Sequence, residues 1–385
     1  MNFEHYIQKG GKTLRYGFTT GSCATLAAKA ACEMLLANKT INSISIITPK
    51  GFNVEVNLLD ITIDENKFVS CAVEKDAGDD PDVTHRALVY AKIEKSSVNG
   101  IHIDGGLGIG RVTRPGLDQP IGNAAINSMP RRMIENEVQS ICDKYGYDGG
   151  LNVIISIPAG VELAKKTFNP QLGIVGGISV LGTSGIVEPQ SSQALIDCIE
   201  VELKAFEAEN IHQVVLTPGN YGENFLSEFK PLENPPTVKC SNFIGDAIDF
   251  AVKHSFKQIL LIGHIGKFSK LAGGIMNTHS SYADCRVEII AAHAALCGAS
   301  KETIFNIMNA VTTDDCISFL DKENLRDDVI KSILGKIYEH ISRRAGDNVS
   351  IAAIMFSNKY GLLGMTDNAK EIIKSMPTVL ASEVL

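Results

Sequence analysis

Apolar residues in the second half of the chain follow two alternating patterns. Some recur at helical spacing, as Leu195, Ile199 and Leu203 do, and the same spacing predicts further helices at residues 244–254, 283–297, 301–312 and 327–344. Short apolar runs lie between them: QVVLTP, QILLIG and VSIAAIMF. This alternation predicts a parallel sheet with helices on both faces. Ligands of such sheets bind beyond the carboxyl ends of the strands, here at residues 217–222 and 263–267.

The first half has a different pattern, with glycine-rich loops between alternating strands. A helix is predicted over Ser22 to Ala37, with Thr20 or Ser22 as its N-cap. ISIITP and FNVEVNLL flank a Pro-Lys-Gly turn, which predicts a hairpin. FVSCAVE and LNVIISIP are predicted strands, and residues 82–95 and 130–145 are predicted helices. We therefore expect an α+β domain over residues 1–190, followed by an α/β domain over residues 191–385.

Composition excludes several classes of protein. The chain has 385 residues, with 36 Lys and Arg against 44 Asp and Glu, and its net charge is −8. No basic run is present, which argues against nucleic acid or an anionic membrane as the main partner. No apolar run approaches the ~18 residues of a membrane span, and no secretory signal is visible. The nine cysteines form no C-x-x-C pair, so we expect free thiols and a cytoplasmic protein.

The predicted start of the first long helix combines glycine and hydroxyl residues, among them Thr19, Thr20 and Ser22. Free N–H groups and hydroxyls at a helix start form an anion site. The alternative is a capped helix that uses small residues for close packing.

A second glycine-rich stretch spans residues 105–116. Its G-x-G-x-G pattern lacks the full dinucleotide fingerprint. Glycines let a backbone approach a ligand, and Arg111, Arg114 and the later Arg131 suit carboxylates or phosphates. The alternative is a flexible loop with solvated arginines. Residues 168–185 combine glycines, hydroxyls and branched apolar residues, as a pocket wall or a bulged sheet edge would.

Two further clusters are candidates for ligand binding. The acidic run EKDAGDDPD at residues 74–82 suits a cation or ribose hydroxyls, but it lacks EF-hand order, and a solvated turn is the favoured interpretation. The histidines and cysteines of residues 264–297 have no recognised ligand spacing, so we expect no protein-bound metal. Patterns of hydrolases and P-loop NTPases are absent from the sequence.

Taken together, these segments resemble one family over nearly the whole chain: the cobalt-precorrin-5B C(1)-methyltransferases of anaerobic cobalamin biosynthesis, the CbiD family. The similar blocks are GFTTGSCATLAAKAA at 17–31, EKDAGDDPDVT at 74–84, GIGRVTRPGLDQPIG at 108–122, AINSMPRRMI at 125–134, TFNPQLGIVGGISVLGTSGIVEP at 167–189, LTPGNYGE at 216–223 and GHIGKFSKLAGGIMNTHSSYAD at 263–284. Leu107 and Asn123 depart from the acids that the family pattern usually has.

The resemblance implies the reaction and the fold. S-adenosylmethionine donates a methyl group to C1 of cobalt-precorrin-5B, which gives cobalt-precorrin-6A, and the cobalt arrives with the substrate. The implied fold is a two-domain α/β protein, with an amino-terminal part like ribosomal protein S5 domain 2 and a Rossmann-like carboxyl-terminal part. The implied partners are these two small molecules. Whether the protein forms a homo-oligomer is left open by the resemblance.

The resemblance also implies which residues bind each molecule, although it assigns no catalytic residue. Substrate carboxylates call for hydroxyls and cations: Thr19, Thr20, Ser22, Arg111, Arg114, Arg131, Lys267, Lys270 and Arg286. The donor needs a glycine turn after a strand and an acid for its ribose: Gly219, Asn220, Tyr221, Gly222, Glu223, Asp246, Gly263 and His264. Two alternatives stay open. A GHMP-type kinase would turn over ATP with Mg²⁺, and a corrinoid carrier would bind corrinoid without the donor.

Overall fold

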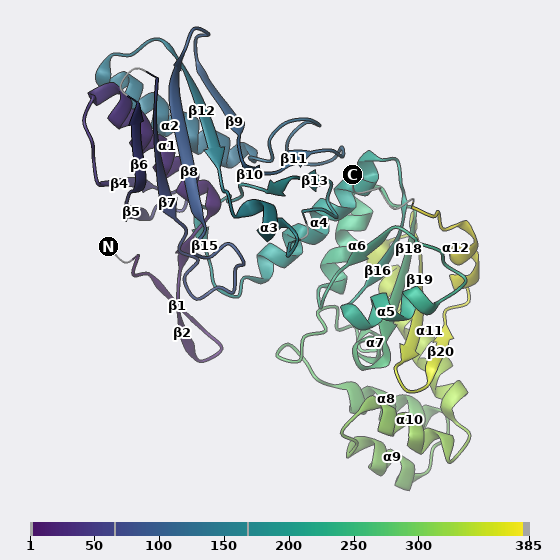
Figure 1. The fold of residues 1–385 in the computed structure, drawn as a ribbon. Coiled ribbons are helices and arrows are strands. Elements are labelled where there is room, and N and C mark those ends of the chain that lie inside the picture. Colours follow the sequence, from purple (N-terminus) through teal and green to yellow (C-terminus); the bar gives the residue numbers. More distant parts are fainter. Residues whose placement is uncertain (1–2, 65–66, 168, 380–385) are drawn as a thin grey trace. The chain divides into compact units, whose positions relative to one another are not determined.

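The computed structural model describes residues 3–64, 67–167 and 169–379. The chain divides into two compact units, Met1–Ser191 and Ser192–Leu385. The predicted domain boundary lies one residue before this division. Figure 1 shows the first unit in purple to teal and the second in teal to yellow. Each unit has its own hydrophobic core, and the fold is mixed α/β.

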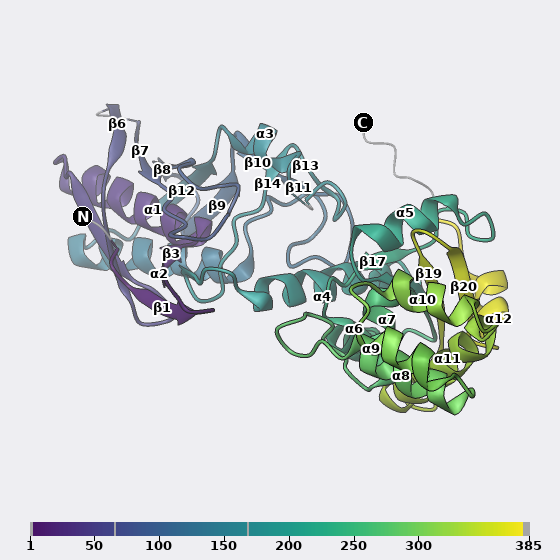
Figure 2. The same cartoon turned by 90° about the horizontal axis from the view of Figure 1, so that it is seen from below.

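The amino-terminal unit is built on a five-stranded sheet of order β6-β7-β8-β12-β9. Only the β12–β9 pair is parallel. Two long helices, α1 and α2, contact each other and the sheet, and Figure 2 shows both on the same side of it. The elements are β6 Leu59–Asp64, β7 Phe68–Glu74, β8 Leu88–Ser96, β12 Gly150–Ser156, β9 Ile101–Gly105, α1 Thr20–Ala37 and α2 Ser128–Tyr145.

The helix predicted over residues 82–95 is wrong, because most of this segment is strand β8. Val89, Ala91 and Ile93 are fully buried and alternate with partly exposed residues. This period of two is the strand period. β8 pairs with β7 and β12 on its two sides, and this pairing overrides the helix preference of its Ala, Lys and Glu residues.

Short strands join the glycine-rich segments of this unit. β10 pairs with β14, and β11 pairs with β13, so residues 105–116 lie against residues 174–178. β15 pairs with β3, just before α1. The predicted hairpin is confirmed as β4 and β5. The elements are β10 Gly108–Ile109, β11 Arg111–Val112, β13 Ile174–Val175, β14 Gly177–Ile178, β15 Ile186–Val187, β3 Gly17–Phe18, β4 Ser43–Ile47, β5 Asn53–Asn57, α3 Gly160–Ala164, and the hairpin β1 Tyr6–Lys9 with β2 Lys12–Arg15.

The carboxyl-terminal unit is built on a sheet of order β17-β16-β18-β19-β20, in which only β20 is antiparallel. The three predicted strands are confirmed as β16, β18 and β19. Helices α4, α6, α7 and α11 cover one face, and α5 and α12 cover the other. The elements are α4 Ser192–Ala208, β16 Gln213–Thr217, α5 Asn220–Glu228, β17 Thr237–Lys239, α6 Ile244–Lys253, β18 Gln258–His264, α7 Ile265–Ala272, α11 Arg326–Ala345, β19 Ser350–Ser357, β20 Gly361–Met365 and α12 Ala369–Ser375.

Three further helices lie between α7 and α11: α8 Arg286–Leu296, α9 Lys301–Met308 and α10 Thr313–Asp321. The helix predicted over 301–312 ends at Met308. α10 begins with a capping box in which the side chains of Thr312 and Asp315 each accept a backbone N–H, and these reciprocal bonds start a separate helix.

Candidate functional site

The sheet of the carboxyl-terminal unit has a switch point between β16 and β18. β16 leads into α5 on one face, whereas β18 leads into α7 on the other face. Loops that diverge in this way leave a crevice at the carboxyl ends of the two strands, which is where ligands of open α/β sheets bind. The two segments predicted as ligand sites, 217–222 and 263–267, therefore lie next to each other.

Two glycines shape the β16 side of this crevice. Gly219 precedes α5 with φ 91° and ψ −177°, a conformation that other residues rarely adopt. Among the described residues, a Cβ on Gly219 would meet only Lys267 Nζ, at 3.6 Å. A Cβ on Gly222 would lie 2.8 Å from Thr217 Cβ and 3.2 Å from the Ile262 carbonyl. Gly222 therefore lets α5 pack closely on the sheet, whereas Gly219 borders open space.

Lys267 lies in the first turn of α7 and is half-buried. Its Nζ donates to the Ser241 carbonyl at 3.2 Å, and no carboxylate among the described residues forms an ion pair with it. Burial lowers the pKa of this lysine. The Thr217 hydroxyl is fully buried and has no hydrogen-bond partner among the described residues. This end of the sheet therefore holds a cation without a described ion-pair partner and a buried hydroxyl without a described hydrogen-bond partner.

His264 is the N-cap of α7. Its Nδ1 accepts the Gly266 N–H at 3.0 Å, so a neutral ring carries its proton on Nε2. Burial lowers the pKa of His264, and Asp314 partly offsets this effect. The ring centroid lies 6.0 Å from that of the exposed Tyr221 and 5.7 Å from that of Phe356.

The remaining predicted donor residues have different surroundings. Asp246 is half-buried in the first turn of α6, just beyond β17. A Cβ on Gly263 would lie 2.0 Å from the Phe268 ring, so this glycine is needed for core packing. Asn220 and Glu223 form part of α5; their side chains lie outside the described part of the structure.

Lys270 and Arg286 hold a loop within the carboxyl-terminal unit. Lys270 is 3% exposed, and its Nζ donates to the carbonyls of Thr278 at 3.0 Å and Ala283 at 2.9 Å. Asp284 accepts two hydrogen bonds from Arg286, at 2.6 and 3.0 Å, and lies 3.6 Å from Lys270. Lys270 is thus occupied by its own loop, which favours a structural role for it.

In the amino-terminal unit, the start of α1 is covered by residues 181–185. The Gly21 N–H donates to the Leu181 carbonyl at 2.9 Å, and the Ser22 hydroxyl donates to the Gly185 carbonyl at 2.7 Å. Thr19 Oγ1 accepts the Ser22 N–H as the N-cap. Thr20 and Ser22 are buried. The chain itself satisfies these groups, so the structure favours a capped helix start over an anion site.

The three arginines of this unit that were predicted as substrate contacts differ in what they contact. Arg131 donates to the carbonyls of Ile126, Ile103 and Ala124, and burial lowers the pKa of its guanidinium. Arg111 forms a bidentate pair with Asp104, at 2.7 and 3.0 Å. Arg114 donates to the Gln171 carbonyl at 3.0 Å, and its stem lies against Gly173. The fixed contacts of Arg131 favour a structural role for this arginine.

The glycine stretch at 105–110 is packed against the unit's own backbone. A Cβ on Gly108 would lie 1.8 Å from the Ile157 carbonyl oxygen. The N–H groups of Gly106 and Gly110 donate to the carbonyls of Ile155 and Ile178. These glycines serve close packing, and their amides are not arranged as a phosphate cradle. The two departures, Leu107 and Asn123, are both exposed.

The acidic run at 74–82 contains a turn with exposed Glu74 and Asp79, as expected, but Asp76 and Asp82 form ion pairs within the protein. Lys75 is 1% exposed and forms an ion pair with Asp82. Asp76 accepts two hydrogen bonds from Arg15, at 2.6 and 2.8 Å. Because these acids are paired, they are not open to a ligand. The sequence signal for this arrangement was the lysine within the acidic run.

Within residues 3–64, 67–167 and 169–379, no group of three or more His, Cys, Asp or Glu could hold a metal ion. No described helix is both long and apolar enough to cross a bilayer. The nine cysteines are free thiols, and burial raises the pKa of Cys23 and Cys71 to about 12.

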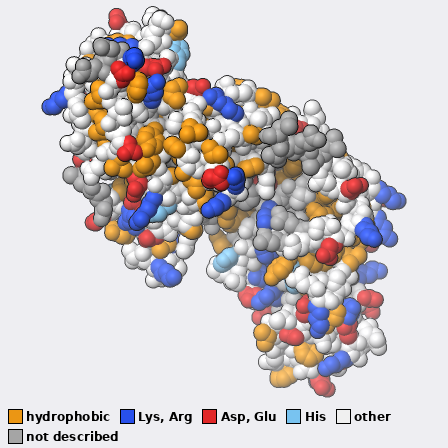
Figure 3. All heavy atoms as spheres, in the orientation of Figure 1, with side chains coloured by type: hydrophobic (Ala, Val, Ile, Leu, Met, Phe, Trp, Pro, Cys, Tyr) orange, Lys and Arg blue, Asp and Glu red, His pale blue; other side chains and the backbone are white. Residues whose placement is uncertain are grey.

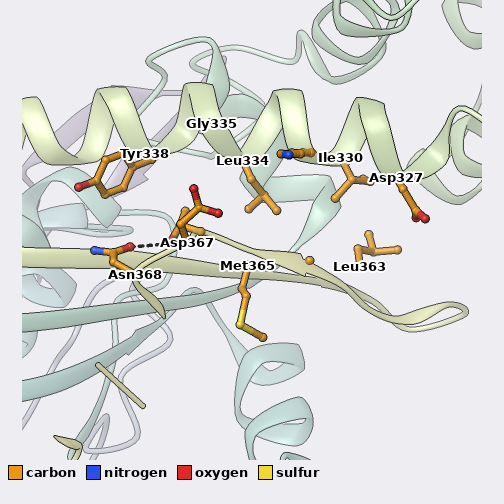
Figure 4. Close-up of a pocket in the computed structure, with 12 residues that line it drawn as sticks. Asp327, Ile330, Leu334, Gly335, Tyr338, Leu363, Met365, Asp367 and Asn368 are labelled. Atoms are coloured by element: carbon orange, nitrogen blue, oxygen red, sulfur yellow. Dashed lines mark hydrogen bonds between the residues drawn. The ribbon is translucent and has the colours of Figure 1, made fainter. Parts of the chain in front are cut away.

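A pocket of about 570 Å³ lies between α11 and the β20–α12 segment. Figure 4 shows Tyr338 and Leu334 of α11 on the same side of the strand as Asp367, whereas the side chain of Met365 points away from α11. Asn368 accepts from the Thr366 hydroxyl at 3.0 Å. Asn368 also donates to the carbonyl of Ile351, which lies near the amino end of β19. The lining includes no residue predicted for the donor or the substrate.

Comparisons with known proteins agree on one family. The CbiD family model matches residues 7–189, and the CbiD C-terminal domain model matches residues 277–367. The cobalt-precorrin-5B C(1)-methyltransferase of Ruminiclostridium cellulolyticum is 50% identical over 96% of this chain and 98% of its own length. That of Alkaliphilus metalliredigens is 45% identical over 97% and 98%. A crystal structure of a cobalamin biosynthesis protein (cbiD) from Archaeoglobus fulgidus, 26% identical, covers 73% of this chain and 87% of its own, with a TM-score of 0.39.

Proposed function

Because this chain belongs to the CbiD family, we propose that it transfers a methyl group from S-adenosylmethionine to C1 of cobalt-precorrin-5B, which gives cobalt-precorrin-6A. The observation that carries this proposal is the 50% identity, over nearly the full length of both chains, to a relative with this name. The corrinoid carries the cobalt as part of the substrate.

The donor binds, in this proposal, at the switch point of the carboxyl-terminal unit. Two residues there fit it, because Gly219 lets backbone approach and Lys267 supplies a cation. We assign Asp246, in the first turn of α6, to a ribose hydroxyl. The positively charged sulfur of the donor supplies an activated methyl group. The four parallel strands with helices on both faces support a Rossmann-like assignment for this unit. The S5-like assignment of the other unit stays a prediction.

The corrinoid contacts the amino-terminal unit in this proposal. Its macrocycle has apolar faces and a rim of carboxylates. The unit exposes Leu107, Ile121 and Leu181 by 64%, 60% and 49%, and Figure 3 shows hydrophobic side chains gathered on one of its faces. Arg111 and Arg114 provide guanidinium groups on the same glycine-rich segment. A cytoplasmic location and a homo-oligomeric state also stay predictions.

The chain's own residues have a modest chemical task. The nucleophile is an electron-rich ring carbon and the methyl group is already activated, so catalysis consists mainly of alignment and the exclusion of water. Neutral His264, with its proton fixed on Nε2, acts as a hydrogen-bond donor at the switch point. No residue is assigned as a general base.

The test is a direct assay of methyl transfer. The purified protein is incubated with cobalt-precorrin-5B and S-adenosylmethionine carrying a labelled methyl group. We expect the corrinoid to gain the mass of one methyl group and S-adenosylhomocysteine to form, and neither change without the donor. Corrinoid that binds but keeps its mass would instead support a carrier. Mg²⁺-dependent ATP turnover would support a kinase, which the closed packing of Gly108 does not favour.

A further inference from the structure

Three loops meet around the amino group of Lys267. The lysine comes from α7, after β18, and its Nζ donates to Ser241 in the loop between β17 and α6. The same Nζ lies 3.6 Å from the Cβ position of Gly219, at the start of α5. Lys267 thus lies at the carboxyl ends of three neighbouring strands, β16, β17 and β18.

Among the described residues, the surroundings of this amino group are mainly positive. Lys267 lies in the first turn of its helix, where the helix dipole disfavours a cation. α5 also begins there. Burial lowers the pKa of Lys267, Cys240 opposes this effect, and the positive charge of Lys270 adds to it. No carboxylate among the described residues pairs with Lys267. A half-buried cation costs free energy unless it is paired, so an anion is the missing partner.

An ammonium group has three donors, and the Ser241 carbonyl uses one of them. No other partner of this amino group is present among the described residues, so two of its donors stay available. A carboxylate with two oxygens suits such a pair of donors. A positively charged sulfur does not, since the ammonium would repel it.

Resting on the proposed function, we infer that Lys267 binds the carboxylate of the amino-acid part of S-adenosylmethionine. This moves Lys267 from the substrate side, where the family resemblance placed it, to the donor site. The carboxylate lies at the far end of the methionine part, so this pairing holds the ammonium away from the sulfur and orients the donor. A corrinoid acetate or propionate is the other source of the same chemistry.

The experiment crosses two ligands with two variants. The ligands are S-adenosylhomocysteine and its decarboxylated analogue, which keeps the amine and the adenosine but lacks the carboxylate. Calorimetric titration measures both against the wild type, Lys267→Met and Lys267→Arg. The control is Lys257→Met, the same substitution at an exposed lysine beside the amino end of β18, the strand that precedes α7.

In the wild type, loss of the carboxylate is expected to weaken binding by about 10-fold to 100-fold, as a charged hydrogen bond does. Lys267→Met should bind S-adenosylhomocysteine more weakly than the wild type does, by a similar factor. Its affinities for the two ligands should be equal. Lys267→Arg should recover part of the discrimination, and Lys257→Met should match the wild type. Circular dichroism and thermal melting check that each variant is folded.

Each contrary result has a separate meaning. If the ratio of the affinities for the two ligands is the same in the wild type and in Lys267→Met, Lys267 does not contact the donor carboxylate. The proposed donor site would not be affected by this result. If Lys267→Met keeps its affinity for S-adenosylhomocysteine but loses affinity for the corrinoid, the carboxylate belongs to the substrate and the inference is wrong. If the wild type does not bind S-adenosylhomocysteine, the donor part of the proposed function fails together with it.

Discussion

Two helix starts in this protein have similar sequences and different surroundings. α1 begins at Thr20, just after Gly17-Phe18-Thr19, and α5 begins at Asn220, just after Thr217-Pro218-Gly219. Both combine hydroxyl residues with glycine, and both are predicted ligand sites. At α1, residues 181–185 occupy the polar groups. At α5, the described residues supply no hydrogen-bond partner to the Thr217 hydroxyl and only one, the Ser241 carbonyl, to the Lys267 ammonium. A helix start that is crowded with small residues therefore indicates that another group packs closely against it. It does not indicate whether that group is a ligand or another segment of the protein.

The glycines explain the difference. A Cβ on Gly182 would lie 2.3 Å from Thr19 Oγ1, so this glycine lets the chain's own segment reach the start of α1. A Cβ on Gly219 would meet nothing closer than Lys267 Nζ, and its φ of 91° requires glycine instead. Gly182 lets another segment of the protein pack against the start of α1, whereas Gly219 leaves room for a ligand at the start of α5.

The largest expected effect is the loss of donor binding in Gly219→Val. S-adenosylhomocysteine should raise the melting temperature of the wild type by mass action, and this shift should disappear in the variant. The added side chain strains the backbone and occupies the space before α5. Gly298→Val is the matched control, because Gly298 also has a positive φ (85°) and has nothing within 4 Å of its Cβ position. A folded Gly219→Val protein with an unchanged shift would remove the donor from this crevice.

Next in size is Arg114→Ala, which tests the substrate side. We expect corrinoid binding to weaken by about 1.5–3 kcal/mol, the range for a charged hydrogen bond, while S-adenosylhomocysteine binding hardly changes. Arg114→Lys should recover part of the loss, because an ammonium lacks the planar fork of a guanidinium. Absorbance titration with the cobalt-corrinoid measures both. The control is exposed Arg132→Ala, expected within about 0.5 kcal/mol of the wild type. Equal affinities in all proteins would place Arg114 outside the substrate site.

A pair of hydroxyl deletions compares the two helix starts directly. Ser22→Ala removes one buried hydrogen bond to the Gly185 carbonyl, which keeps the Thr19 N–H as its other donor, so the free energy of unfolding should fall by about 0.5–1.5 kcal/mol. Thr217→Val replaces an unpartnered hydroxyl by a methyl group of similar size, so stability should stay the same or rise. Urea unfolding measures both. Equal losses in the two variants would mean that the Thr217 hydroxyl has a partner in solution.

The smallest expected effect is a pH dependence at His264. Its folded pKa lies below the ordinary 6.5 because the ring is buried, so the unfolded chain takes up the proton first as the pH falls. Stability should therefore decrease as the pH falls through 6.5 towards the lowered folded pKa, and protonation would also remove the cap on Gly266. His264→Gln should reduce this decrease. Urea unfolding at a series of pH values tests it, and parallel curves for the two proteins would contradict it.

The local sequence pattern was sufficient for elements whose residues carry a clear period. The strands β16, β18 and β19, the hairpin of β4 and β5, and most of the long helices follow from it. It failed at β8, because Leu88–Ser96 mixes good helix formers with an alternation that only the neighbouring strands stabilise. It also missed α5, because a glycine turn followed by few apolar residues gives little helical period.

The amino-acid sequence alone determined the family, the α/β class and the places where a parallel sheet would bind a ligand, because these depend on residue order and on short-range periodicity. Only the tertiary structure decided which polar groups remain available. Arg131 and Lys270 looked like ligand-binding groups, and each instead donates to carbonyls of the protein itself, Arg131 to that of Ile103 and Lys270 to those of Thr278 and Ala283. Those partners are mostly backbone carbonyls, which every residue has, so the sequence carries no local sign of them.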